Sequence, residues 1–301
     1  MKTKVLYLAI VLVTVFSLIF LLNINENIGQ PSDIDITQIT KGENNSTTSQ
    51  SGFILLLGAF GQEIDGLRRQ LDIEEVVAGQ DYKLYRGKYE NRDILLVQTG
   101  MGKERAESAT KSVLEHYPVT AIISVGVAGG LNPELKIGAV ILCSTLYYVN
   151  GSDQKDPKAE PYASDANLIS LASEGPEDIK ANCYIGSSVT VLRLESNPQK
   201  QQELVETLNA DVVEMESYWI ARIASVRGIP FIAIRAISDR GNDVQPFDQI
   251  LTSDGKLLWK KALVCFTTHP HYLLKVFNLY MHVRVATKNL TACVLNLVTK
   301  L

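Results

Sequence analysis

The 301-residue sequence has little cysteine, few aromatic side chains and no large excess of charge of either sign. Its four cysteines form no C-x-x-C pair, so composition and spacing argue against both a disulfide scaffold and a cysteine-based zinc site. Lys and Arg number 29 against 33 Asp and Glu, and a net charge of −4 argues against a nucleic-acid-binding protein. No G-x-G-x-x-G run is present, which removes the usual dinucleotide-binding fingerprint.

The amino terminus contains the longest uncharged run. Residues 5–22 carry no charge, and eighteen residues are just enough for a helix to cross the hydrocarbon core of a bilayer. The run is longer than the apolar centre of a typical signal peptide, so residues 1–22 are predicted to be an uncleaved transmembrane anchor, with a cleaved signal as the alternative. Lys2 and Lys4 precede the run and acidic residues follow it. The positive-inside rule therefore places the rest of the chain outside the cytoplasm.

Three further segments follow from composition and periodicity. Residues 23–51 are rich in Asn, Ser, Thr and Asp, which predicts a flexible polar linker. Residues 52–268 are predicted to form the folded domain. Apolar residues recur at helical spacing over residues 269–301, which predicts an amphipathic helix that packs on this domain. A second membrane contact there is the less favoured alternative, because Lys275, Arg284 and Lys288 interrupt the apolar pattern.

Short apolar runs alternate with amphipathic stretches between residues 52 and 240. A helix is predicted over residues 103–115. Strands are predicted over residues 53–57, 93–98, 121–125, 139–142 and 229–236. Continuous apolar strands separated by helices are typical of a largely parallel sheet that helices cover on both faces. We therefore expect an α/β fold with a mixed, mainly parallel central sheet flanked by helices.

Polar residues follow several of these strands, at the edge of the sheet where α/β proteins bind ligands. Glu63 comes just after the first strand, and glycines at 126–130 are predicted to form a turn that lets a ligand approach the backbone. Glu214 and Glu216 lie at the start of a predicted helix, and residues 235–239 end the last strand. Each group alone is compatible with an ordinary structural role. Their order along the chain is what indicates one site.

Five short motifs carry a family resemblance. They are G-A-x-x-x-E at 58–63, T-G-M-G-K at 99–103, V-G-V-A-G-G-L at 125–131, V-E-M-E at 213–216 and R-A-I-S-D at 235–239. With these motifs in order from about Phe53 to Asp243, the sequence resembles the nucleoside phosphorylase superfamily and, within it, the 5′-methylthioadenosine/S-adenosylhomocysteine nucleosidases. The resemblance implies hydrolysis of the N-glycosidic bond of an adenine nucleoside, in purine nucleoside catabolism and methionine salvage. It also implies a homodimer that uses neither a metal nor an organic cofactor.

The resemblance also implies roles for individual residues. Glu63 matches the residue that activates water, and Asp239 matches the general acid that protonates the purine at N7. Arg235 matches a residue that orients the nucleophile and the neighbouring carboxylates. Glu216 matches the carboxylate that holds the ribose hydroxyls, and Met215 matches a residue that packs against the sugar.

Three more positions are implied to contact substrate less directly: Val127, Gly129 and Glu214. Many relatives carry Ser or Thr at the position of Val127, and residues 189–193 lack the aromatic side chain expected near the purine. Both departures bear on which nucleoside is the substrate and not on cleavage of the N-glycosidic bond.

Alternatives to the nucleosidase remain. A phosphorylase is disfavoured because the Glu63 carboxylate would repel phosphate, and Arg68 and Arg69 lie a turn or more into the following helix. The tail from residue 254 resembles hopanoid-associated nucleosidases, which act on adenosylhopane. A nucleoside-binding protein without catalysis is disfavoured because all the catalytic residues implied above are present together.

Overall fold

The structure is a computed structural model, and it describes residues 52–79, 82–150, 159–193, 198–240, 258–269 and 272–301. The predicted membrane helix at residues 1–22 and the predicted linker at 23–51 lie outside these ranges. No helix in the described ranges is both long enough and apolar enough to cross a membrane.

The described strands form one mixed sheet. They are β1 (Phe53–Gly58), β2 (Asp72–Ala78), β3 (Lys83–Tyr89), β4 (Arg92–Gln98), β5 (Val119–Gly130), β6 (Val140–Val149), β7 (Tyr162–Ala163), β8 (Cys183–Val191), β9 (Val212–Glu214) and β10 (Phe231–Asp239). The order is β10-β6-β8-β9-β5-β1-β4-β3-β2, with β7 on β6. Because β10 also pairs with β5, the strands β5, β9, β8, β6 and β10 close a ring, from which β1, β4, β3 and β2 extend as an open sheet.

The expectation of a mainly parallel sheet needs correction. Among the described strands, five pairings are parallel and five are antiparallel. The strands β4, β1, β5 and β10 run parallel at the centre, as their continuous apolar runs predict. The antiparallel part includes β2, β3 and β4, which follow one another so closely in the sequence that only antiparallel pairing can join them.

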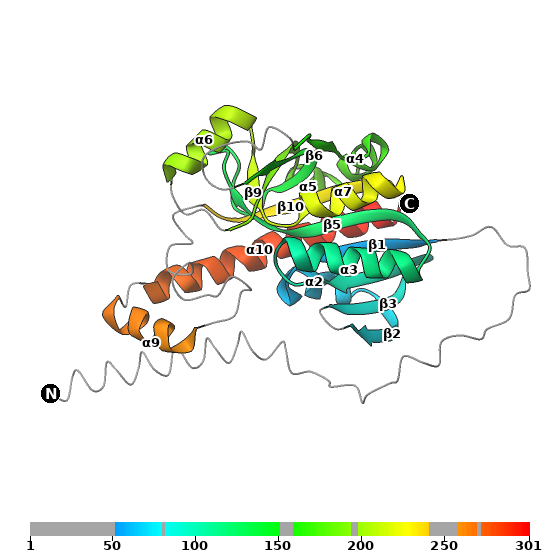
Figure 1. Cartoon of the computed structure of the whole chain (residues 1–301), viewed down its shortest axis with the longest axis horizontal. Helices are drawn as coiled ribbons and strands as arrows, with labels where there is room; N and C mark the ends of the chain where they lie inside the picture. The colour runs from blue at the N-terminus through cyan, green and yellow to red at the C-terminus, as the bar shows by residue number, and fades with distance from the viewer. Residues whose placement is uncertain (1–51, 80–81, 151–158, 194–197, 241–257, 270–271) are drawn as a thin grey trace, which may run out of the picture. The chain divides into compact units, whose positions relative to one another are not determined.

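Helices cover both faces of the sheet (Figure 1). They are α2 (Gly61–Arg68), α3 (Lys103–His116), α4 (Ala166–Ser173), α5 (Glu177–Lys180), α6 (Pro198–Leu208), α7 (Ser217–Arg227), α9 (Trp259–Thr268) and α10 (Tyr272–Val298). Leu56 of β1 packs in one core cluster with Ile64 of α2 and Leu290 of α10. The next residue, Leu57, points to the other face and packs in a second cluster with residues of α3 and α7.

Residues 52–301 form one compact unit, which contains both core clusters of the described residues. Alternate residues of β1, β4, β5 and β10 supply both clusters, and α2, α4 and α10 face the first cluster while α3 and α7 face the second. Because this unit has a hydrophobic core on both faces of its sheet, we expect the fragment 52–301 to fold without the segment that precedes it.

The structure places two predicted boundaries elsewhere. The glycines at 126–130 continue strand β5 instead of forming a turn, because β10 pairs along them in parallel. The absence of side chains allows this close pairing: a Cβ on Gly130 would lie 2.9 Å from Ile237 Cγ2. The helix predicted from Glu214 begins at Ser217, because Glu214 ends β9, where it pairs with Thr190 of β8.

Candidate active site

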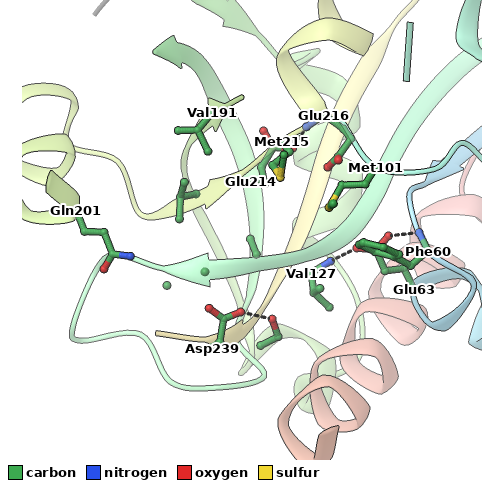
Figure 2. Close-up of a pocket in the computed structure, with 15 residues that line it drawn as sticks. Phe60, Glu63, Met101, Val127, Val191, Gln201, Glu214, Met215, Glu216 and Asp239 are labelled. Carbon is green, nitrogen blue, oxygen red and sulfur yellow. Dashed lines mark hydrogen bonds between the residues drawn. The ribbon is translucent and has the colours of Figure 1, made fainter. Parts of the chain in front are cut away.

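A cavity lies where α2, the ends of β5 and β10, and the junction between β9 and α7 meet (Figure 2). Seven of the eight residues predicted for the site line it: Glu63, Val127, Gly129, Glu214, Met215, Glu216 and Asp239. Arg235 is not among the lining residues; it lies buried behind the wall, with 2% of its surface exposed. The motifs that are far apart in the sequence therefore meet at one place.

Glu63 is held in place by three backbone N–H groups. Its Oε2 accepts hydrogen bonds from Ala59 (2.8 Å) and Phe60 (2.9 Å), and its Oε1 accepts one from Val127 (2.9 Å). The first two donors lie at the start of α2, and the third lies in β5. Burial raises the pKa of the Glu63 carboxyl, although these donors and the positive charge of Arg235 act in the opposite direction. The result is a fixed, dehydrated carboxyl at one end of the cavity.

Gly126 leaves the space that the Glu63 carboxylate occupies. A Cβ at this position would lie 2.7 Å from Glu63 Oε1 and 3.3 Å from a terminal guanidinium nitrogen of Arg235. Because both neighbours are already anchored, Gly126→Ala is expected to displace the carboxylate and lower kcat/KM by about tenfold or more. Steady-state kinetics test this. The matched control is Gly61→Ala, whose new Cβ has its nearest neighbour at 3.7 Å and should leave kcat/KM unchanged.

A buried ion pair supports the cavity from behind. Arg235 contacts Glu214 Oε2 at 3.0 Å, and it also donates to Ser124 Oγ at 2.9 Å. Glu214 Oε2 further accepts the backbone N–H groups of Glu216 (2.9 Å) and Ser217 (2.7 Å), and Thr190 donates its hydroxyl to Oε1. Glu214 thus satisfies donors at the start of α7, as an N-cap side chain does. Its carboxylate fixes the position of the neighbouring Glu216.

Glu216 is the N-cap residue of α7, and its side chain points into the cavity (Figure 2). Its Oε1 accepts a hydrogen bond from the backbone N–H of Gly102 at 2.8 Å. Gly102 has a φ of 91°, a backbone conformation that residues with a Cβ atom rarely adopt. Burial, followed by the negative charges of Glu214 and Glu63, raises the pKa of Glu216 to about 8. These causes favour the protonated form of the Glu216 carboxyl at neutral pH.

This raised pKa predicts how stability depends on pH. Between the ordinary value of 4.5 and about 8, the folded protein holds a proton on Glu216 that the unfolded chain has lost. Since the folded state then binds more protons, the free energy of unfolding falls as pH rises across this window. From pH 5 to pH 8 the free energy of unfolding of the wild-type protein is expected to fall by on the order of 3 kcal/mol more than that of Glu216→Gln. The glutamine side chain does not titrate in this range. Urea unfolding at both pH values measures the difference; equal losses in the two proteins would contradict it.

Asp239 ends strand β10 and lines the cavity away from Glu63 in the view of Figure 2. Ser238 donates its hydroxyl to Asp239 Oδ2 at 2.7 Å. Gly129 of β5 pairs with Asp239 in the sheet, and a Cβ on Gly129 would lie 3.4 Å from Asp239 Oδ1. Gly129 therefore borders the carboxyl group of Asp239.

Several lining residues carried no strong indication in the sequence. Phe60 lies at the N-cap of α2, Met101 follows β4, and Gln201 comes from α6. Val191 lines the cavity in the segment where an aromatic side chain was expected. Met101 belongs to one of the five motifs, whereas the position of Gln201 depends on how α6 packs, which periodicity does not reveal. Among the described residues, no three His, Cys, Asp or Glu side chains cluster as a metal site would require.

Comparisons with known proteins identify the family of the chain. The phosphorylase superfamily matches residues 53–258. The 5′-methylthioadenosine/S-adenosylhomocysteine nucleosidase of Listeria innocua is 31% identical over 229 residues, which cover 70% of this chain and 95% of the relative. The protein of the same name from Tolumonas auensis is 28% identical over 203 residues, covering 64% of this chain and 87% of the relative.

Solved structures share the fold. The nucleosidase of the same name from Neisseria meningitidis, in complex with methylthio-immucillin-A, gives a TM-score of 0.67 at 22% identity and covers 83% of this chain and 100% of its own. Futalosine hydrolase of Helicobacter pylori gives 0.66 at 18% identity, with 83% and 99% covered. At these identities the structures bear on the fold alone. The match to the family and the relatives together establish that the chain belongs to the phosphorylase superfamily. It is a hydrolase of N-glycosidic bonds.

Proposed function

We propose that this protein hydrolyses the N-glycosidic bond of an adenine nucleoside of the 5′-methylthioadenosine/S-adenosylhomocysteine type and releases adenine. The observation that carries the proposal is the convergence of Glu63, Glu216 and Asp239 on one cavity, with Met215 beside them. Cleavage of this bond builds positive charge on the ribose and negative charge on the purine. It therefore needs a base for water, a group that holds the sugar and an acid for the leaving purine.

The charge of the cavity favours water over phosphate as the nucleophile. The described lining residues include four carboxyl side chains and no Lys or Arg. Arg235 lies behind the wall and is paired with Glu214, and Arg68 is paired with Asp65 at 3.0 Å on α2. A phosphate ion binds where cationic groups and free donors face it, and the donors around Glu63 are already occupied by its carboxylate. This supports hydrolysis over phosphorolysis.

We assign the remaining roles from the family resemblance, and the place of each residue in or behind the cavity is compatible with them. Glu63, with its raised pKa, takes a proton from the attacking water. Glu216 binds the ribose hydroxyls from the start of α7, and Met215 packs against the sugar. Asp239 donates a proton to N7 of the purine, with Ser238 holding its carboxyl group. Arg235 acts through Glu214 and through the field it exerts on Glu63, so it is a positioning residue.

Release of the free purine base by residues 52–301 tests the proposal. Methylthioadenosine, S-adenosylhomocysteine, adenosine and inosine are each offered with and without phosphate. We expect phosphate-independent release of adenine, fastest from the two 5′-thio-substituted substrates. Phosphate-dependent turnover would make the protein a phosphorylase, and a folded fragment that turns over none of the four would contradict the assigned substrate class.

The cellular setting is a separate part of the proposal. We propose that residues 1–22 anchor the protein in a membrane with the catalytic domain outside the cytoplasm, and that the protein is a homodimer. The uncharged run at 5–22 and the two lysines before it support the anchor. Protease treatment of intact cells, followed by detection of the domain, tests the orientation, and sedimentation of the fragment 52–301 tests the dimer.

A further inference from the structure

The carboxyl-terminal helices carry an exposed apolar surface that the active site does not use. Of the large hydrophobic side chains that are exposed in the described residues, a group of four lies on one face of α10: Leu274 (68% exposed), Phe277 (53%), Met281 (40%) and Val285 (46%). Their spacing of three and four residues makes them one line along the helix, which we name the α10 stripe. Val264 of α9 is also exposed, at 61%.

The α10 stripe does not belong to the hydrophobic core. The buried residues of the same helix, including Val276, Ala286, Leu290 and Val294, lie on the opposite face. The latter three pack with residues of the sheet and of α2 in the first core cluster. None of the stripe residues lines the active-site cavity. An outward-facing row of this kind indicates an interaction surface.

The charge of this region differs from that of the rest of the chain. Residues 255–301 contain seven Lys and Arg and no Asp or Glu, although the whole chain has a net charge of −4. Lys261, Arg284 and Lys288 are exposed, and the last two share the outward half of α10 with the stripe. An apolar row beside exclusively positive side chains is the pattern of helices that lie in the interface of an anionic membrane.

We propose that the α10 stripe and its basic flank dock on the surface of an anionic lipid bilayer, with α10 lying in the plane of the interface. The basic residues that argue against a membrane-crossing helix here are the ones that favour this contact, because they remain at the level of the lipid headgroups. A second copy of the same stripe is a poorer partner, because two tails of like charge would face each other. If the uncharged run at 5–22 anchors the chain as proposed above, it would tether this surface to a bilayer and raise the effective concentration of lipid at the stripe.

Vesicle flotation tests the proposal with residues 52–301, which lack the amino-terminal run. Vesicles of phosphatidylcholine alone are compared with vesicles that also contain phosphatidylserine. We expect the fragment to float with the anionic vesicles, less with the neutral ones, and progressively less as salt screens the charges. The double variant Leu274→Ser with Phe277→Ser should weaken vesicle binding by about tenfold or more, because both exposed apolar side chains are lost.

The matched control is Ile185→Ser with Val226→Ser, which removes two exposed apolar side chains (61% and 82%) elsewhere on the domain. This control should float as the unmodified fragment does, and thermal unfolding verifies that both variants are folded. Absence of flotation with anionic vesicles would overturn the proposal, as would flotation that the stripe variant leaves unchanged. If the fragment fails to float and the stripe variant instead converts a dimer to a monomer in sedimentation, the stripe is an interface between copies and the lipid proposal is wrong.

Discussion

Replacing Glu63 by glutamine is expected to lower kcat by a factor of about 10³, within the range that a positioned general base contributes. The amide has the shape of the carboxyl group, and its oxygen can still accept the hydrogen bonds from Ala59 and Phe60. It has no site that takes a proton from water at neutral pH. The cavity should therefore bind the nucleoside with KM changed much less than kcat.

The Glu63→Gln substitution has one cost that must be separated from its effect on the kinetics. The NH₂ group of the amide would face the backbone N–H of Val127, which now donates to Glu63 Oε1, so one buried hydrogen bond is lost. Such a loss costs about 1–3 kcal/mol of stability, and urea unfolding measures it independently of turnover. Glu75→Gln is the matched control, because it makes the same change in a carboxylate paired with Arg86 on the exposed sheet edge. A Glu63→Gln enzyme that keeps more than about a tenth of wild-type kcat would contradict the assignment.

The sequence predicts the centre of the fold better than its edges. The strands β1 and β4 and the helix α3 agree closely with their predicted ranges, because continuous apolar runs and a helical repeat define them. The edge strand β2 alternates exposed and half-buried residues and contains no fully buried one, so it has no apolar run to find. The continuation of β5 through its glycines depends on β10 lying against them, which is a tertiary contact.

The sequence likewise predicts only part of the candidate site. Glu63, Glu216 and Asp239 follow strands or precede a helix, so a rule about sheet edges places them together. Arg235 was predicted for catalysis from the same motif as Asp239, yet residues 235 and 239 differ in what they reach: Arg235 is buried against Glu214, and Asp239 faces the cavity. Periodicity does not reveal that difference. It depends on the register shift between Ile237 and Asp239 and on how far the strand extends.

Asp239→Asn is expected to abolish adenine release to a similar degree, for a different reason. Asparagine keeps the size of the side chain and can still accept the hydrogen bond from Ser238, so the cavity should keep its shape. It has no acidic proton to transfer to the purine, and adenine is a poor leaving group unless N7 is protonated. We expect kcat for methylthioadenosine to fall by about 10²–10⁴, the contribution of a general acid.

A change of leaving group separates the acid from the base. A 5′-methylthioriboside of 4-nitrophenol releases a stable phenolate that needs no proton, so Asp239→Asn should cleave it at close to the wild-type rate. Glu63→Gln should remain inactive toward it, because water must still be activated. Release of nitrophenolate, followed by its absorbance, measures the cleavage rate of both variants.

If Asp239→Asn is equally impaired on the two substrates, Asp239 does not act as the acid and its effect comes from binding or from the shape of the cavity. If both variants cleave the nitrophenyl riboside at wild-type rates, the attacking water is activated elsewhere, and the carboxyl at the start of α2 has a structural role in holding Val127 and the end of β5.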